Sequence, residues 1–531
     1  MELILSNEGL KDRASWEAKG YQLPQYDRAA MVANTKANPT WIHFGAGNIF
    51  KAFQCAAVQK LLNDGTLDKG VIAVERMKKG EDTHDGLTVA VTLKANGTVE
   101  KAVIGSIAET VYLYGDEERM AEIFSAPSLQ MASFTITEKG YATRTPAGEL
   151  TQDITDDIAA GPAAAKTYMG KVAALLLARF NAGALPIAMV SMDNCSHNGS
   201  RLQAAMEAFA DAWAERGIGD KEFAEYIRDR KLVSFPWSMI DKITPRPDAS
   251  VREMIESDGF DDMSSRETAT HSFVAPFVNA EEAQYLVIED VFPNGKPALD
   301  KAGVIFTTRE TVDKVETMKV CTCLNPLHTA LAVLGCLLGF TKISEEMKDE
   351  DLKKTVEIVG YKEGLPVVVD PGVISPKSFI DEVINKRLPN PFLQDTPQRI
   401  ATDTSQKLAI RFGNTIKKYV ASDKLDVKDL KVIPFVQAAW CRYLMAIDDN
   451  GDAFKPSDDP MLPELQPKFA SIKLGESCDV HAILQPVLSN ANIMGVDLYE
   501  VGLGEEVEKN FAELIKGPGA IRKALHTKVN E

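Results

Sequence analysis

Residues 41–62 read WIHFGAGNIFKAFQCAAVQKLL, and this stretch decides the fold. It begins with four residues of an apolar strand pattern, continues through a glycine turn, and ends in apolar residues at helical spacing. In such a unit, Gly45 and Gly47 let the backbone approach a pyrophosphate, and the start of the helix supplies unpaired N–H groups. The stretch therefore predicts the dinucleotide-binding turn of an α/β domain.

The next apolar run, residues 70–74, supports this prediction. It reads GVIAV and is followed by Glu75. In dinucleotide-binding folds, an acidic residue at the end of the second strand holds the ribose hydroxyls of the adenosine, so Glu75 favours NAD as the cofactor. Arg76 follows directly and can serve a 2′-phosphate instead, which keeps NADP as the alternative.

Two later strand patterns end in polar residues. The strand within residues 131–141 leads into a loop with the polar residues Thr137, Glu138 and Lys139. The strand at residues 185–192 ends in Asp193 and Asn194. Because ligands bind at the carboxyl edge of a doubly wound sheet, we expect the first loop near the nicotinamide. For Asp193 and Asn194, capping of the following helix is the alternative.

The pattern of the chain changes after residue 297. Before it, strands and helices alternate, and residues 87–107 form a hairpin pattern around Asn96 and Gly97. Several turn-forming residues precede the change: Pro293, Asn294, Gly295 and Pro297. We therefore predict an α/β chain with a Rossmann-type dinucleotide-binding domain over residues 1–297. A mostly α-helical domain for substrate binding and catalysis should follow over residues 298–531.

Residues 316–328, ETMKVCTCLNPLH, carry the groups that oxidation of an alcohol requires. A secondary alcohol loses its hydroxyl proton as its hydride leaves, so the site needs a base, an oxyanion donor and a residue that orients the hydroxyl. Lys319, Asn325 and His328 can fill these roles, and Glu316 can relay the proton to water. The alternative is a buried helix start with a capping asparagine and a satisfied histidine.

These motifs, in this order, resemble the polyol-specific long-chain dehydrogenases and reductases over residues 41–419. The shared motifs include TITEKGY at 135–141, SMDNCSHNG at 191–199 and FPWSMIDKITP at 235–245. The resemblance implies that Lys319 is the general acid/base and that His328 positions the substrate. It further implies that Asn194 and Asn325 donate hydrogen bonds to the developing oxyanion.

The resemblance also implies contacts to the cofactor and the substrate. Asn48 and Phe50 belong to the segment that follows the glycine turn, where the family has a histidine that this chain lacks. The expected substrate-binding residues are Arg399, Lys407, Asp241 and Lys139. On a regular helix, Arg399 and Lys407 would lie about 80° apart and reach one cleft. A solvated basic face is the alternative for them, and a structural pair with Lys242 or Arg246 is the alternative for Asp241.

The spacing between Lys319 and Asn325 departs from the family, because five residues intervene instead of four. On a regular helix one extra residue rotates Lys319 by about 100° relative to Asn325. We therefore predict a π-type widening or an extended segment across residues 320–324. The regular helix should begin near Asn325 and Pro326, since proline is tolerated in a first turn.

Composition narrows the functional classes. A net charge of −17 argues against a nucleic-acid groove or an anionic membrane surface. Seven cysteines suit free thiols in a reducing compartment, and the chain has no run of about 18 apolar residues, so we expect a cytoplasmic protein. The Cys321 and Cys323 pair has no second Cys/His cluster nearby, and we expect no metal.

The sequence thus predicts an NAD-dependent, metal-independent oxidoreductase that acts on a secondary CH–OH group. Several basic residues could receive a carboxylate, which favours D-fructuronate and D-mannonate as the substrate pair: Arg399, Lys407, Lys242 and Arg246. The alternatives are interconversion of mannitol and fructose, tagaturonate reduction, and a non-catalytic NAD-binding protein. We expect a small-molecule sugar acid or polyol as the only partner, without nucleic acid or membrane, and a monomer or small homo-oligomer.

Overall fold

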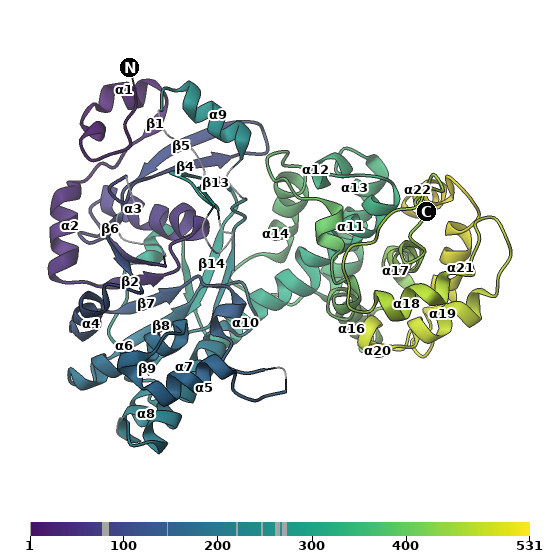
Figure 1. The fold of residues 1–531 in the computed structure, drawn as a ribbon. Helices are drawn as coiled ribbons and strands as arrows, with labels where there is room; N and C mark the ends of the chain where they lie inside the picture. The colour runs from purple at the N-terminus through teal and green to yellow at the C-terminus, as the bar shows by residue number, and fades with distance from the viewer. Residues whose placement is uncertain are drawn as a thin grey trace. The chain divides into compact units, whose positions relative to one another are not determined.

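The computed structural model describes residues 2–76, 84–145, 147–218, 221–245, 248–260, 266–267 and 273–531, so Arg246 lies outside the described residues. The chain divides into two compact units (Figure 1). The first comprises Met1–Leu93 and Gly97–Asp313, and the second comprises Lys94–Asn96 and Lys314–Glu531. The first unit extends past residue 297 because β15 (Ile305–Thr307) pairs with β14 (Tyr285–Glu289) in the same sheet.

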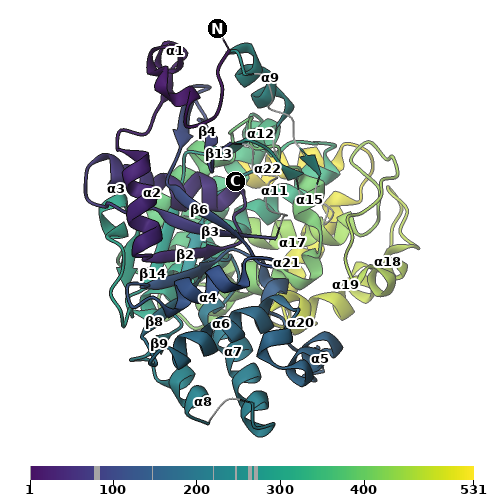
Figure 2. The same cartoon turned by 60° about the vertical axis from the view of Figure 1, so that its left-hand side comes forward.

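A six-stranded parallel sheet forms the centre of the first unit, in the order β6-β3-β2-β7-β8-β9 (Figures 1 and 2). Its strands are β2 (Trp41–Phe44), β3 (Val71–Glu75), β6 (Ile107–Tyr112), β7 (Met131–Phe134), β8 (Ile187–Ser191) and β9 (Val233–Ser234). The chain builds outward from β2 in one direction and from β7 in the other. The topological switch point, where such sheets bind ligands, therefore lies between β2 and β7. This confirms the predicted Rossmann-type fold.

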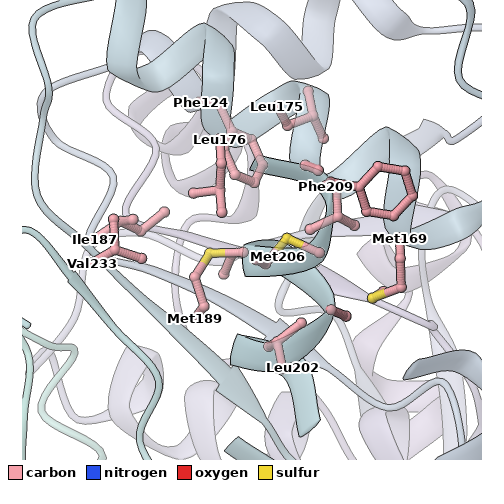
Figure 3. Packing of buried hydrophobic residues seen from close by; sticks show 14 of the residues in the cluster. Phe124, Met169, Leu175, Leu176, Ile187, Met189, Leu202, Met206, Phe209 and Val233 are labelled. Carbon is pink, nitrogen blue, oxygen red and sulfur yellow. The ribbon is translucent and has the colours of Figure 1, made fainter. Parts of the chain in front are cut away.

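Both faces of this sheet are buried, because apolar side chains point alternately to the two sides. In β2, Ile42 and Phe44 pack into one core cluster and Trp41 into the other. The first cluster joins the sheet to α4 (Glu117–Ser125), α6 (Tyr168–Asn181) and α7 (Asn198–Glu215), as Figure 3 shows for part of it. The second cluster joins it to α2 (Arg28–Ala37) and α3 (Cys55–Asn63). Strands buried on both faces are characteristic of parallel sheets covered by helices.

Smaller sheets complete the first unit. The predicted hairpin is confirmed: β4 (Thr88–Leu93) and β5 (Val99–Ile104) are antiparallel, with Leu93 opposite Val99. They belong to a four-stranded sheet with β1 (Tyr21–Gln22) and β13 (Phe277–Glu281). A three-stranded sheet has the order β10-β14-β15, and β11 pairs with β12. The remaining elements are η1 (Gly9–Lys11), α1 (Arg13–Ala18), η2 (Phe50–Gln54), η3 (Glu138–Tyr141), α5 (Gln152–Ala160), η4 (Pro162–Ala164), α8 (Lys221–Arg228), β10 (Ser238–Asp241), α9 (Ala249–Ser257), β11 (Arg266–Glu267), β12 (Phe273–Val274) and η5 (Leu299–Ala302).

The second unit is helical, as predicted, and residues 314–531, all of which the structure describes, form no strand beyond the Ile447–Ala453 bridge. Its elements are the end of α10 (Arg309–Met318), η6 (Lys319–Cys323), α11 (Asn325–Leu337), α12 (Ile343–Glu346), α13 (Glu350–Glu357), η7 (Ile358–Gly364), η8 (Leu365–Val367), α14 (Pro376–Glu382), η9 (Val383–Arg387), α15 (Pro397–Ala401), η10 (Thr404–Gln406), η11 (Ala409–Gly413), α16 (Asn414–Val420), η12 (Val427–Asp429), α17 (Val432–Tyr443), α18 (Leu462–Phe469), α19 (Val480–Leu488), α20 (Ala491–Met494), α21 (Gly504–Leu514) and α22 (Ala520–Asn530). The helical run Arg309–Leu337 is long and apolar enough to cross a membrane. However, 83% of its most apolar 18-residue stretch is buried inside the protein. We therefore interpret α11 as a core helix.

Asn198 ties three elements of the first unit together. Its side-chain amide lies 3.1 Å from the Ser191 carbonyl at the end of β8 and 3.0 Å from the Ser238 carbonyl in β10. Its side-chain oxygen accepts the backbone N–H groups of Gly199, at 2.8 Å, and of Ser238, at 3.0 Å. Asn198 is fully buried, so these bonds fix the loop that carries Asp193 and Asn194.

Candidate active site

The glycine turn lies at the switch point, and its two glycines have different structural roles. Gly45 has φ +91°, and a Cβ on it would lie 2.2 Å from the Thr135 carbonyl oxygen at the end of β7. Only glycine fits there, because both the conformation and the packing exclude a side chain. Gly47 has no atom closer to such a Cβ than the Gly45 oxygen at 4.0 Å. The space beside Gly47 is therefore open to a ligand.

The helix that follows this turn begins with unpaired amides. The Lys51 amide donates to the Gly47 carbonyl at 3.1 Å, which makes Gly47 the first acceptor of the helix. Within the described part of the chain, the amides of Asn48, Ile49 and Phe50 have no backbone acceptor. Their N–H groups and the positive end of the helix dipole suit a pyrophosphate. The Phe50 ring is fully buried, so only its backbone can contribute.

A chain of buried hydrogen bonds holds the glycine turn in place. His43 bridges the Ser133 hydroxyl, 2.6 Å from its Nδ1, and the Thr135 hydroxyl, 2.9 Å from its Nε2. The Thr135 hydroxyl donates to the Gly45 carbonyl at 2.7 Å, and the Trp41 indole N–H donates to the Ser133 oxygen at 2.7 Å. This order of donors requires a neutral imidazole protonated on Nε2. Burial lowers the pKa of His43 to about 3, which keeps it neutral.

The predicted ribose-binding position lies at the same edge of the sheet. Glu75 is the last residue of β3, as expected, and its side chain is half-buried. Arg76 is exposed, with its guanidinium 6.0 Å from the centre of the Tyr114 ring and 5.9 Å from that of Tyr168. The arginine therefore has aromatic partners of its own beside the expected ribose position.

Asp193 organises the loop after β7. Its carboxylate accepts the backbone N–H groups of Ile136 and Thr137, both at 2.9 Å, and the Tyr141 hydroxyl at 2.5 Å. Thr137 has φ +66°, a strained conformation for a threonine, which these bonds support. Burial raises the pKa of the Asp193 carboxyl, and the three hydrogen bonds oppose that change. Asp193 therefore supports the loop after β7, whereas the sequence indicated only capping of the following helix as its structural role.

The other predicted residues of the first unit differ in exposure. Glu138, Lys139 and Asn194 are exposed, and Glu138 pairs with Arg201 at 3.0 Å. Asp241 is buried at the end of β10. Lys242 donates to the Glu281 carbonyl at 2.9 Å and to the Gln284 side chain at 3.0 Å. The residues at the ends of β3, β7 and β8 thus lie at the carboxyl edge of one sheet, as predicted from the chain pattern.

In the second unit, the predicted widening before Asn325 is confirmed. Residues Lys319–Cys323 form a π-helix, and the Leu324 amide donates to the Lys319 carbonyl, five residues back, at 3.1 Å. The regular helix α11 begins at Asn325, with proline in its first turn. A π-turn absorbs the extra residue without unwinding the helix. Lys319 is buried, with an exposure of 4%.

His328 lies on α11, one turn after Asn325, and is surrounded by charged groups. Burial lowers its pKa to about 4, Asp395 opposes this, and three arginines add to it: Arg387, Arg411 and Arg399. His328 is therefore a neutral imidazole at physiological pH. Such a group can donate one hydrogen bond and accept another, which suits orientation of a hydroxyl.

The expectation that Arg399 and Lys407 share a regular helix is wrong. The helix α15 ends at Ala401, Asp403 has φ +55°, and a 3-10 turn follows before Lys407. Arg399 forms two hydrogen bonds with Asp395, at 2.7 and 2.6 Å. Lys407 folds back onto the carbonyls of Ile400, at 3.2 Å, and Thr402. The break arises because the Thr402–Asp403 backbone leaves the helical region, which spacing alone does not reveal.

Neither a metal cluster nor a disulfide is found in the described residues. No group of three or more His, Cys, Asp or Glu side chains there could hold an ion. All seven cysteines are free thiols, and Cys321 and Cys323 are buried. Burial raises the pKa of both thiols, which suits packing and not ligation.

Comparison with known proteins assigns the family. Residues 39–301 match the mannitol dehydrogenase Rossmann domain, and residues 311–515 match the mannitol dehydrogenase C-terminal domain. The chain belongs to the mannitol dehydrogenase family. Members of this family are oxidoreductases, so the predicted enzyme class is confirmed.

The relatives and the solved structure described next match most or nearly all of the chain. It is 51% identical to "D-mannonate oxidoreductase" of Thermotoga maritima, over 98% of each chain. It is 28% identical to "Polyol:NADP oxidoreductase" of Gluconobacter oxydans, over 85% of this chain and 87% of the relative. The Pseudomonas fluorescens mannitol 2-dehydrogenase, solved with NAD and D-mannitol, is 26% identical over 99% of each chain, with a TM-score of 0.70.

The buried His43 of this mannitol dehydrogenase family member should make its stability depend on pH. The folded-state pKa of about 3 lies below the ordinary value of 6.5, so only the unfolded chain takes up the proton between them. The contribution of neutral His43 to the free energy of unfolding is therefore fully present above about pH 6.5. It falls as the pH decreases, by about 1.4 kcal/mol per pH unit for one proton. In His43→Gln this contribution should be absent, giving a shallower loss of unfolding free energy in urea titrations between about pH 6.5 and 5. The exposed His197→Gln serves as the control, and equal slopes for wild type and His43→Gln would contradict the prediction.

Proposed function

We propose that this chain is an NAD-dependent oxidoreductase that interconverts D-mannonate and D-fructuronate. The observation that carries the proposal is the whole-length identity of 51% to a protein named D-mannonate oxidoreductase. The sites agree with it, since one unit offers a dinucleotide turn and the other offers a lysine, an asparagine and a histidine around a π-turn.

The first unit would bind NAD at the carboxyl edge of its parallel sheet. The turn at Gly45 and Gly47 and the open amides of Asn48 and Phe50 would hold the pyrophosphate, and Glu75 the adenosine ribose. Thr137 and Glu138 would lie along the nicotinamide half of the cofactor. When bound, NAD supplies the acceptor for the substrate's hydride.

The remaining residues would handle the substrate's proton and oxygen. Lys319 would take the proton of the secondary hydroxyl, and Glu316, one turn before it on α10, would pass the proton to water. Asn325 and Asn194 would donate hydrogen bonds to the developing alkoxide. The neutral His328 would orient the hydroxyl. The proposed substrate contacts are Arg399, Lys407, Asp241 and Lys139.

Interconversion of mannitol and fructose is the second candidate function. It is supported by the likeness to the mannitol 2-dehydrogenase solved with D-mannitol. Both functions imply a small-molecule substrate, and we propose a cytoplasmic monomer or small homo-oligomer without nucleic acid or membrane partners.

The substrate assignment is tested with a panel of polyols and aldonates. The purified protein should produce NADH absorbance with NAD and D-mannonate, and consume NADH with D-fructuronate. Its kcat/KM for D-mannonate should exceed that for D-mannitol by at least tenfold. Higher efficiency with D-mannitol would favour the second candidate, and no turnover of any compound would leave a non-catalytic NAD-binding protein.

Lys319→Ala should lower kcat by about 10²- to 10⁴-fold, the usual contribution of a general acid/base. NADH affinity, measured by fluorescence titration, should stay unchanged because Lys319 acts on the substrate proton. Lys139→Ala is the informative comparison, because Lys139 lies in the loop that we expect near the nicotinamide and is therefore the next candidate for the base. If Lys319→Ala keeps near-normal turnover and Lys139→Ala is inactive, the role of general base belongs to Lys139 and not to Lys319.

Glu75→Ala should narrow the preference for NAD over NADP, because it removes the carboxylate that repels a 2′-phosphate. Steady-state kcat/KM for the two cofactors gives the ratio directly. Arg76→Ala is the paired variant, and it should lower use of NADP without weakening NAD. Equal use of both cofactors by the wild type would refute the role of Glu75.

A further inference from the structure

Arg411 is a half-buried cation held next to the residues proposed for catalysis. It lies in the π-helix η11, and its guanidinium donates to the Thr329 hydroxyl at 2.6 Å and lies 3.5 Å from the Asn325 carbonyl. Both partners belong to α11, on either side of His328. The Asn414 side chain contacts the Cys321 sulfur at 3.2 Å, so the same segment also packs on η6. Arg411 was not singled out from the sequence, where it is one of several basic residues after Lys407.

The two neighbouring basic side chains proposed above as substrate contacts also have partners within the protein, which makes them less suited to take up a carboxylate. Arg399 is paired with Asp395 through two hydrogen bonds, at 2.7 and 2.6 Å. Lys407 donates to two backbone carbonyls at the end of α15. By contrast, the partners of Arg411 are neutral oxygens, and no carboxylate among the described residues acts on its charge.

In the described part of the chain, the partly buried positive charge of Arg411 has no negative charge beside it to compensate it. Removing a cation from water is costly unless an opposite charge compensates it, and here burial alone lowers the pKa of Arg411 to about 10. The side chain still carries its charge at neutral pH. It offers five N–H donors in a planar arrangement, of which the Thr329 and Asn325 oxygens engage one nitrogen. The remaining donors match the two oxygens of a carboxylate.

We propose that Arg411 binds the carboxylate of the sugar-acid substrate and thereby selects aldonates and keto-uronates over neutral polyols. This inference rests on the proposed function, because it names the residue by which that reaction recognises its acid. The Thr329 and Asn325 contacts fix the guanidinium, and a bound carboxylate completes its charge.

The test compares Arg411→Gln with wild type, using NAD at saturation. Loss of a charge-assisted pair should raise KM for D-mannonate by about 10- to 100-fold. The KM for D-mannitol, where turnover is measurable, and the affinity for NADH should change less than threefold. Lys417→Met is the matched control, since Lys417 is exposed on the following helix α16, and it should behave as wild type.

Arg411→Lys keeps the charge but loses the planar pair of donors, so its KM for D-mannonate should lie between those of wild type and Arg411→Gln. If Arg411→Gln does not fold, this second variant decides, and a KM within threefold of wild type would overturn the inference. Weaker NADH binding with unchanged KM for D-mannonate would also overturn it, by assigning Arg411 to the cofactor. A wild type that ignores D-mannonate would instead refute the proposed function.

Discussion

The parallel pairing of β2 with β7 is the constraint on which the nucleotide site depends. Because the two parallel strands pair in register, Phe44 lies opposite Phe134. The loops that follow the two strands therefore leave the sheet at the same edge. The loop after β7 then packs so tightly on Gly45 that no side chain fits, and Thr135 reaches its carbonyl. The cofactor turn is thus held by its neighbouring strand as much as by its own glycines.

π-helical turns occur at several residues for which we propose a catalytic or binding role. The described residues contain five π-helical segments: η2, η6, η7, η9 and η11. Such turns are rare and concentrate at functional sites, since an inserted residue re-aims side chains without breaking the helix. Here they include Lys319 in η6 and Arg411 in η11, and η2 directly follows the open amides at Asn48 and Ile49.

The sequence predicted those features that depend on local pattern. The glycine turn, the strand ending at Glu75 and the hairpin follow from alternation and turn residues, and the π-turn followed from one extra residue between Lys319 and Asn325. The residues missed are those whose role depends on distant partners. His43 contacts Ser133 and Thr135, about 90 positions away, and Asp193 supports a loop near Thr137. A helical wheel likewise failed for Arg399 and Lys407, because backbone breaks between them are not encoded in spacing.

Natural selection would act for different reasons on Gly45 and Gly47 of the cofactor turn. At position 45 a methyl group meets the backbone of β7, so selection against alanine acts on folding whether or not any cofactor is bound. At position 47 the same methyl group meets no protein atom closer than the Gly45 oxygen at 4.0 Å, so the fold tolerates it and a bound ligand is the expected source of selection against it. A descendant that kept the first glycine and lost the second would therefore be expected to have kept the fold while its hold on the nucleotide was relaxed.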